Sequence, residues 1–348
     1  MKVLQSSLLR SEPAETLRRA SRHPLIARVA DGLVRAEVDA TERVLLLVSG
    51  GSDSMALLVA MAALADRVSS STRSSIAVLT VDHGLREESA MEVQLVASAA
   101  RALGIETCVC ERVEVEADAN ILAAARDARY QVAVAVARRL AIRTLVVAHQ
   151  AEDCAESLLL ALERGDGLES LARLRPRRIM HDWHGVAIAR PLLNVPRAEL
   201  RAFLTDCTVD WIEDPSNALH ARGAMREEPA IASLVERVAR GLGNLADEAL
   251  ECIAWRERCI TEILNSDGTS CTRQAFDNLP ISFRCALISQ MVRKSGGEMS
   301  RSMIETAATS DSRAPRRFRS TNGMELTIDA RCVRIARSEF TAPRDTRP

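Results

Sequence analysis

Short apolar runs alternate with longer segments of helical character between residues 43 and 163. Each apolar run has the length of a buried strand, and each longer segment is apolar around much of its circumference. Strands that alternate with helices of about 12 to 20 residues predict right-handed crossovers and a doubly wound parallel sheet of the α/β class. The expected strands are 43–48, 76–81, 105–113 and 143–148, and the expected helices are 53–65, 87–103, 120–140 and 152–163.

The pattern changes after about residue 165, and loops with short elements are expected as far as residue 226. Apolar positions at helical spacing then predict a helix over 230–265 and another near 280–293, and alternation predicts a hairpin over 324–335. The sequence therefore predicts three parts: a leader at 1–42, an α/β domain at 43–226, and a smaller region at 227–348. We expect this last region to be mostly helical at first and mixed α+β towards its end.

Acidic and basic residues nearly balance, 47 against 46, and give a net charge of −1. This balance excludes a uniformly basic protein that coats nucleic acid, but it permits a local basic surface. Aromatic residues make up only 3% of the chain, so broad platforms for stacking bases are not expected.

The nine cysteines are scattered and include no C-x-x-C spacing. Zinc ribbons and iron–sulfur ligation are therefore unsupported, and reduced cysteines in a cytoplasmic protein are the simplest interpretation. No apolar run approaches the roughly 18 residues of a membrane span. Residues 1–42 lack the apolar core of a signal peptide and contain acids that a transit peptide avoids. We therefore expect a cytoplasmic protein that does not associate with membranes.

The string S-G-G-S-D-S follows the first expected strand and opens the first expected helix. Its glycines let backbone N–H groups approach an anion, and the helix adds the positive end of its dipole. Its serine hydroxyls can donate to phosphate oxygens, and Asp53 can hold a magnesium ion that bridges them. The string differs from a Walker loop and from the dinucleotide fingerprint; it resembles the pyrophosphate-binding loop (PP-loop) of the ATP pyrophosphatases. The loop residues are Ser49, Gly50, Gly51, Ser52, Asp53 and Ser54.

Polar residues also follow the second and fourth expected strands. Asp82 and His83 come directly after the second strand, where a turn with a satisfied histidine is the alternative interpretation. Asp153 and Glu156 are three residues apart in the first turn of a helix and share a face. Two carboxylates beside a nucleotide would repel its phosphates but suit an ammonium group, so they favour a cationic substrate. The alternative is that these acids only complement the helix dipole.

Six further strings together resemble the tRNA(Ile)-lysidine synthetases, a family within the ATP pyrophosphatases. The W-x-E-D-x-S-N string in this place distinguishes that family from its relatives, and the resemblance covers about residues 43–226. The strings are V-D-H-G-L-R at 81–86, A-R-x-x-R-Y at 125–130, A-H-Q-A-E-D-C-A-E-S at 148–157, L-E-R-G-D-G-L at 162–168, R-P-L-L-x-x-x-R-x-E-L at 190–200 and W-I-E-D-P-S-N at 211–217.

The resemblance implies a carbon–nitrogen ligase that joins L-lysine to C2 of the wobble cytidine of tRNA(Ile) with a CAU anticodon. ATP and Mg²⁺ would activate the tRNA through an adenylated intermediate, with release of AMP and pyrophosphate. The resemblance is also compatible with a homodimer. It makes 43–226 the catalytic domain and 227–348 a tRNA-binding region.

The same resemblance assigns roles to single residues. The catalytic residues would be Asp53, Arg129 and Asp153, although a solvated basic face is the default interpretation of the arginine pair at 126 and 129. ATP would bind the 49–54 loop with Asp82 and His83, and a metal would bind Asp53. Lysine would bind Asp153, Glu156 and Arg222. The tRNA-binding residues would be Arg173, Arg175, Arg177, Arg178, Arg316 and Arg317.

The chain departs from the family pattern at several positions. Glu152 stands where the family usually has aspartate, Cys154 where glutamine is common, and Ser170 and Gly223 replace a glycine and an asparagine. The stretch 217–222 is also shorter than the pattern. Two other hypotheses therefore stay open: a tRNA 2-thiolation enzyme, which would need paired or catalytic cysteines, and a non-catalytic relative that binds nucleotide or RNA.

Overall fold

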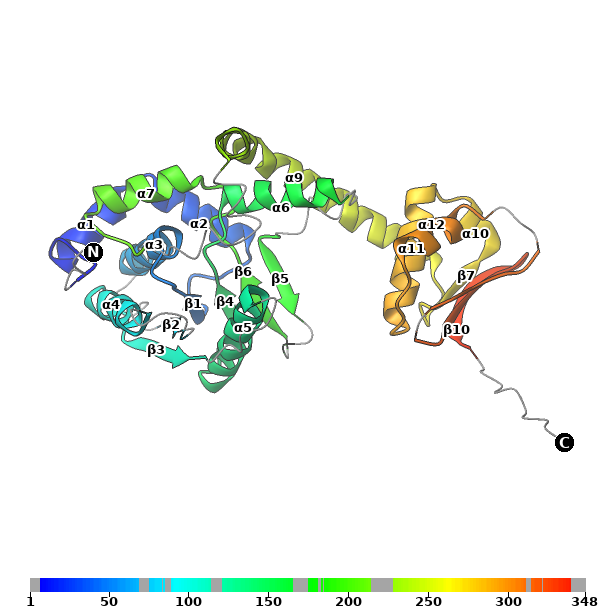
Figure 1. Cartoon of the computed structure of the whole chain (residues 1–348), viewed down its shortest axis with the longest axis horizontal. Coiled ribbons are helices and arrows are strands. Elements are labelled where there is room, and N and C mark those ends of the chain that lie inside the picture. Colours follow the sequence, from blue (N-terminus) through cyan, green and yellow to red (C-terminus); the bar gives the residue numbers. More distant parts are fainter. Residues whose placement is uncertain are drawn as a thin grey trace. The chain divides into compact units, whose positions relative to one another are not determined.

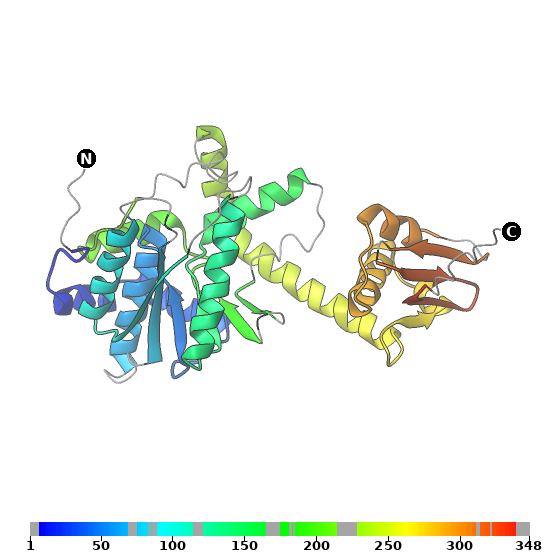
Figure 2. The same ribbon diagram turned by 60° about the horizontal axis from the view of Figure 1, so that its bottom comes forward.

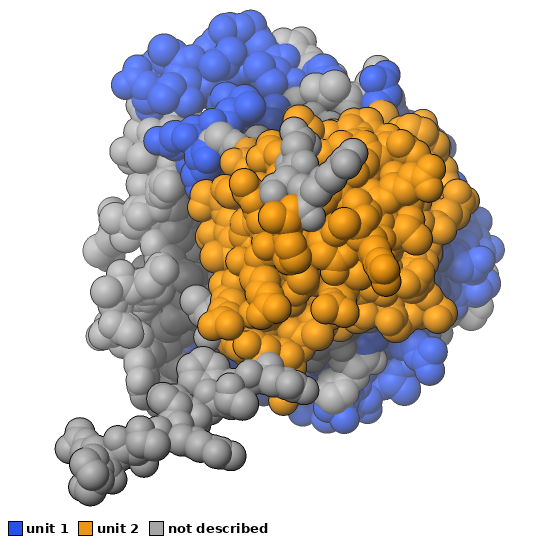
Figure 3. All heavy atoms as spheres, turned by 90° about the vertical axis from the view of Figure 1, so that its right-hand side faces the viewer, with its two compact units in different colours: residues 1–249 blue, residues 250–348 orange. Residues whose placement is uncertain are grey.

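The computed structural model describes residues 7–68, 75–82, 84, 89–113, 121–164, 175–180, 183, 185–213, 228–310, 314–320 and 322–338. The chain divides into two compact units, residues 1–249 and 250–348, which Figure 3 colours separately. The division falls inside helix α9 (Pro229–Ile263), whereas the change of pattern predicts a boundary near residue 226. None of the described helices has both the length and the apolar character needed to cross a membrane.

Unit 1 contains a six-stranded sheet in the order β3-β2-β1-β4-β6-β5 (Figure 1). All its strand pairs are parallel except that of β5, an edge strand, with β6. The predicted α/β fold with a mostly parallel sheet is therefore confirmed. The strands are β1 Val44–Leu47, β2 Ile76–Asp82, β3 Thr107–Arg112, β4 Thr144–Val146, β5 Arg177–Met180 and β6 Val186–Ala189.

Alternate residues of the central strands face opposite sides of the sheet, and both sides are buried. Val44 and Leu46 of β1 pack into one hydrophobic cluster, whereas Leu45 packs into another. In β2, Val78 joins the first cluster and Leu79 the second. A strand covered on both faces must be apolar at successive positions, which explains the continuous apolar runs in the sequence.

Helices cover both faces of this sheet (Figures 1 and 2). Helices α1, α2, α3, α4 and α7 supply residues to the cluster that contains Val44, and α5 supplies residues to the cluster that contains Leu45. Helix α6 packs through Ala151 and Ala155 against the first part of α9. The helices are α1 Pro13–Arg22, α2 Leu25–Arg35, α3 Ser52–Val68, α4 Ser89–Ala102, α5 Ile121–Arg139, α6 Ala151–Glu163 and α7 Arg197–Asp206.

The residues expected to form a leader contribute to the core of unit 1. Helices α1 and α2 bury Leu17, Ile26 and Val29 in the same cluster as α3. In α2, Gly32 lies against the loop after β6: a Cβ at this position would lie only 1.9 Å from the Pro191 carbonyl oxygen. The close approach of helix to loop therefore requires glycine at this position.

Strands β5 and β6 and helix α7 are the short elements of the stretch after residue 165, where the sequence predicted loops with short elements but did not place them. Strand β5 has the sequence R-R-I-M, which does not alternate, so its pattern gave no indication of a strand. Helix α7 is only ten residues long, and it buries Leu200, Phe203 and Leu204. These elements depend on packing against the rest of unit 1 more than on a periodic pattern of their own.

Unit 2 contains a four-stranded antiparallel sheet in the order β7-β10-β9-β8 and several helices. The hairpin expected at 324–335 corresponds to β9 and β10, and the helix expected near 280–293 corresponds to α11. The elements are β7 Ser270–Thr272, α10 Arg273–Asp277, α11 Ile281–Lys294, α12 Arg301–Ala308, β8 Arg316–Arg319, β9 Met324–Ile328 and β10 Cys332–Arg337.

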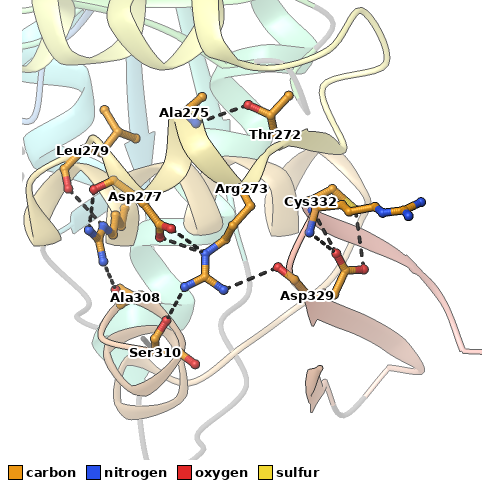
Figure 4. A network of polar contacts seen from close by, with 11 residues as sticks. Thr272, Arg273, Ala275, Asp277, Leu279, Ala308, Ser310, Asp329 and Cys332 are labelled. Carbon is orange, nitrogen blue, oxygen red and sulfur yellow. Dashed lines mark hydrogen bonds and ion pairs between the residues drawn. The ribbon is translucent and has the colours of Figure 1, made fainter. Parts of the chain in front are cut away.

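A single arginine joins three segments of unit 2 (Figure 4). The Arg273 side chain donates to the Asp277 carboxylate at 2.8 Å, to the Ser310 carbonyl at 3.1 Å and to the Asp329 carbonyl at 3.4 Å. The Asp329 carboxylate in turn accepts the Cys332 backbone N–H at 2.9 Å. Arg273 therefore connects α10 to the end of α12 and to the turn before β10.

The contact at Gly32 predicts opposite effects for two Gly→Ala substitutions in helices. Gly32→Ala should lower the free energy of unfolding by about 1–3 kcal/mol, because the new methyl group meets backbone that cannot move aside. The matched control is Gly241→Ala in α9, where a Cβ meets nothing within 4 Å. Alanine there should raise stability by up to ~1 kcal/mol through helix propensity alone. Urea denaturation followed by circular dichroism measures both; equal stabilisation of the two variants would contradict the contact.

Candidate functional site

The site lies where two neighbouring strands of the sheet end. β1 pairs with β2 on one side and with β4 on the other, so the chain leaves β1 and β4 towards different parts of the sheet. In doubly wound sheets, ligands bind at such a switch point, beyond the carboxyl ends of the strands. The 49–54 loop follows β1, and residues 150–156 at the start of α6 follow β4.

The 49–54 loop has a backbone that suits only glycine at its second position. Gly50 has φ +88°, a conformation that side-chain-bearing residues rarely adopt. Its carbonyl accepts the Ile212 N–H at 2.9 Å, so residues 211–213 of the W-I-E-D string are attached directly to the loop. The Ser54 hydroxyl donates to the Gly51 carbonyl at 3.0 Å and accepts the Ser49 N–H at 3.2 Å. The loop is thus closed on itself at the amino end of α3.

Asp153 has a structural role at the start of α6 in addition to its predicted role. One of its carboxylate oxygens accepts the Gln150 N–H at 3.0 Å, and the Gln150 side chain accepts the Glu152 N–H at 2.6 Å. These reciprocal bonds form a capping box, which satisfies amide groups at the helix start. Glu156 follows one turn later and is fully buried. Both the helix-start interpretation and the substrate interpretation of these acids are therefore compatible with the geometry.

Arg197, to which the sequence assigned no role, connects the two halves of the site. Its Nε lies 3.5 Å from Oδ2 of Asp53 in the loop. Its backbone N–H lies 3.2 and 3.0 Å from the two carboxylate oxygens of Glu152, which is buried in α6. Glu152 therefore fixes the start of α7, and α7 presents a guanidinium to the acidic residue of the loop.

Burial and neighbouring negative charge disfavour the ionised forms of Asp53 and Glu152. Burial raises the pKa of Asp53, the nearby Arg197 opposes this rise, and the charge of Asp153 adds to it. Burial also raises the pKa of Glu152; the backbone N–H of Arg197 opposes the rise, and the charge of Asp53 contributes to it. Added positive charge at this place would therefore stabilise the ionised carboxylates.

Asp82 organises the turn that follows β2. One of its oxygens accepts the Gly84 N–H at 2.8 Å and the hydroxyl hydrogen of Ser89, the first residue of α4. The carboxylate is buried, so it holds the turn in shape at the same edge of the sheet as the 49–54 loop. His83, the other residue predicted there, lies outside the described residues.

The remaining predicted residues have separate surroundings. Arg129 is half-buried in α5, with its guanidinium 5.7 Å from the ring centre of Tyr130. Arg177 donates to the carbonyls of Ala36 at 3.2 Å and Glu37 at 3.1 Å, so it joins β5 to the end of α2. The predicted residues Arg173 and Arg222 lie outside the described part of the chain.

The other arginines predicted to contact tRNA lie on surfaces of both units. Arg175 is half-buried and Arg178 is exposed in unit 1. Arg316 and Arg317 are exposed on β8, an edge strand of the sheet in unit 2, and Arg317 lies 3.7 Å from Glu325. Arg319 on the same strand pairs with the same glutamate at 2.8 Å.

Sequence reasoning missed both Arg197 and Glu152. Arg197 belongs to the R-P-L-L-x-x-x-R-x-E-L string, so it stood inside a matched motif, but nothing local indicated that it reaches Asp53. Glu152 was noted only as a departure from aspartate. Its function in this structure, to accept a backbone N–H from a residue 45 positions away, is visible only in three dimensions.

The donor set is compatible with magnesium that is shared with a substrate. Among the described residues, no group of three or more His, Cys, Asp or Glu side chains could hold a metal ion by itself. Mg²⁺ is usually held by one or two carboxylates together with phosphate oxygens and water. Asp53, with hydroxyls of the loop beside it, offers that arrangement.

Comparisons with known proteins agree with the motifs. The family model for a PP-loop domain matches residues 24–228. The tRNA(Ile)-lysidine synthase of Novosphingobium aromaticivorans is 33% identical over 76% of this chain and 79% of its own length. The one of Salinispora tropica is 38% identical over 66% and 67%, and the one of Ruegeria pomeroyi is 38% identical over 60% and 49%. The chain therefore belongs to the tRNA(Ile)-lysidine synthase family of PP-loop proteins.

Proposed function

We propose that this chain joins L-lysine to C2 of the wobble cytidine of tRNA(Ile) with a CAU anticodon and converts ATP to AMP and pyrophosphate. The observation that carries the proposal is that two kinds of group lie at the same switch point of the sheet: a loop suited to phosphate and a pair of carboxylates. An anion-binding loop ends β1, and a carboxylate pair suited to an ammonium group begins α6. The proposal places the reaction in the cytoplasm and allows the chain to act as a homodimer.

The reaction has two steps in this proposal. The cytosine C2 oxygen attacks the α-phosphorus of ATP, and the bond to the β-phosphate oxygen breaks, so pyrophosphate leaves. The ε-amine of lysine then attacks C2, the bond between C2 and the adenylate oxygen breaks, and AMP leaves. The amine gives up its protons to solvent or to a neighbouring base during this second step.

The residues of the site divide these tasks. The 49–54 loop holds the phosphates through backbone N–H groups and hydroxyls at the positive end of α3. Asp53 would hold Mg²⁺, whose charge stabilises the negative charge that develops on the departing pyrophosphate. Asp153 and Glu156 bind the ammonium group of lysine, and Arg129 with Arg222 contacts carboxylate, phosphate or base.

Asp53→Asn tests the assignment of the loop. The change keeps the shape of the side chain and removes its charge, so ATP-dependent incorporation of radiolabelled lysine into unmodified tRNA(Ile) should fall by about 100-fold or more. The matched control is Asp31→Asn, an exposed aspartate in α2, which should leave incorporation unchanged. Unaltered incorporation by the Asp53 variant would show that the loop is assigned wrongly.

The same assay separates the other two functional classes. A 2-thiolation enzyme would consume ATP on tRNA in the presence of a sulfur donor and would not need lysine. A non-catalytic relative would bind nucleotide or RNA and release no AMP. Lysine-dependent release of AMP with label in the tRNA supports the proposal, and its absence with the wild-type chain rejects it.

Phosphate binding by exposed arginines predicts how the affinity for tRNA depends on salt. Replacement of Arg175 and Arg178 with glutamine, or of Arg316 and Arg317, should weaken binding and flatten the plot of log affinity against log salt. The slope should change by about 1 for each phosphate group that the variant no longer neutralises. Filter binding at a series of salt concentrations measures this slope.

Two controls accompany the salt series. Arg138→Gln, an exposed arginine on α5, should leave the slope unchanged. Arg177→Gln should instead lower thermal stability, because its guanidinium holds the carbonyls at the end of α2. A wild-type slope in both paired variants would reject these surfaces as phosphate contacts.

A further inference from the structure

We propose that Arg197 is a pyrophosphate-binding residue that exchanges partners, pairing with Asp53 before the nucleotide binds and with the terminal phosphates of ATP afterwards. The inference rests on the proposed function, because it takes the 49–54 loop as the place where those phosphates bind. It adds a cation that the sequence motifs left without a role. The inference rests on the geometry of three groups: the Asp53 carboxylate in the loop, the Arg197 guanidinium, and the buried Glu152 carboxylate that bonds the Arg197 backbone.

The Glu152 carboxylate holds the backbone of Arg197 in position. Both carboxylate oxygens of this glutamate lie within 3.2 Å of the Arg197 backbone N–H, and the glutamate side chain is buried. The preceding residue, Pro196, is extended, and α7 begins at Arg197. The backbone of the arginine is therefore anchored while its side chain extends towards the loop.

The Arg197 guanidinium uses few of its donors among the described residues. Arginine offers five N–H groups, and within the described part of the chain this side chain forms its hydrogen bond through Nε, at 3.5 Å from Asp53. The distance is at the long end for a hydrogen bond, so the pair is loosely held. The side chain of Arg197 is 22% exposed and that of Asp53 is 23% exposed, so an anion can reach both from solvent. The two terminal nitrogens can form the forked contact by which arginine binds phosphate.

The charges around Arg197 explain why the site needs a fixed cation. The negative charge of Asp153 contributes to the raised pKa of Asp53, and that of Asp53 contributes to the raised pKa of Glu152, so these carboxylates lie near one another. A triphosphate brought to these carboxylates meets like charge, and a magnesium ion on Asp53 offsets only part of it. When a cation occupies Asp53, Arg197 loses its partner and can turn its terminal nitrogens to phosphate oxygens without breaking the backbone anchor at Glu152.

The first experiment compares ligands that share different parts of ATP. Arg197→Gln should weaken binding of MgATP and of magnesium pyrophosphate by about 10- to 100-fold, the usual effect of removing one hydrogen bond to a charged group. Binding of AMP should change less than about twofold, because AMP lacks the terminal phosphates. Arg197→Lys, which keeps the charge, should restore part of the affinity. Arg138→Gln on the surface of α5 should bind all three ligands as the wild type does.

The second experiment separates phosphate binding from simple pairing with Asp53. In buffer with EDTA, Asp53→Asn should bind metal-free pyrophosphate more tightly than the wild type. The substitution removes the negative charge that repels pyrophosphate, and it frees Arg197 from its ion pair with Asp53. The double variant Asp53→Asn/Arg197→Gln should lose this gain and bind about 10-fold more weakly than Asp53→Asn. Isothermal titration calorimetry measures each affinity, and thermal melting confirms that each variant is folded.

The outcomes are distinct. If Asp53→Asn and the double variant bind pyrophosphate equally, Arg197 only neutralises Asp53 and the inference is wrong, whereas the proposed function stands. If Arg197→Gln weakens AMP as much as pyrophosphate, its effect is structural and the inference is again wrong. If the wild-type chain binds neither ATP nor pyrophosphate, the proposed function and the inference fail together.

Discussion

Strand β1 pairs with β2 on one side and with β4 on the other, and the position of every site residue depends on these two parallel ladders. The chain turns outwards in opposite directions from β1 and β4, and in doubly wound sheets ligands bind beyond the carboxyl ends of the strands at such a point. The loop at 49–54 enters from one strand and the start of α6 enters from the other. The fold thus places the glycine-containing loop at 49–54 beside carboxylates that the sequence separates by about a hundred residues.

This arrangement carries an electrostatic conflict. The same edge of the sheet holds Asp53, Glu152 and Asp153 and, by the proposed function, also receives a polyanion. A net charge of −1 over the chain conceals this conflict, because it averages acids gathered at the site with arginines spread over both units. The local solution in the structure is a guanidinium on α7, held against the loop by a buried glutamate. Positive charge is therefore supplied where it acts on Asp53.

The sequence predicted the elements of unit 1 between residues 43 and 163 because their apolar patterns are strong, whereas helices α1 and α2 lie in the stretch that was expected to be a leader. A strand buried on both faces must be apolar throughout, and 43–48 and 76–81 show this directly. The positions of strand β5 and helix α7 were not predicted within a stretch of expected short elements, since a four-residue strand and a ten-residue helix depend on tertiary packing for their stability.

For the candidate site, too, the sequence indicates features formed by neighbouring residues but not contacts between residues far apart in the chain. The loop at 49–54 was predictable because its glycines, serines and aspartate act through their own local backbone. The contact between Arg197 and Asp53 was not, because it joins residues far apart in the sequence and depends on how α7 begins. Arg177 shows a second limit of local sequence: its place in a basic turn predicts contact with RNA, whereas its hydrogen bonds to the carbonyls of Ala36 and Glu37, just after α2, are visible only in three dimensions.

The path of α7 explains the spacing between two of the family strings, the one at 190–200 and the one that begins at residue 211. The helix begins at Arg197 beside Asp53 and, with ten residues, rises about 15 Å along its axis. The chain then returns through residues 207–212, whose extended length of roughly 20 Å is enough to bring Ile212 back to the Gly50 carbonyl. The return path is supported midway by residues 8–10, since Leu9 pairs with Val209 and Arg10 with Asp210. Both ends of this segment contact the same loop, so a change in the length of either arm would displace Arg197 from Asp53 or Ile212 from Gly50. Residues 8–10 therefore help to position the segment that contacts the loop.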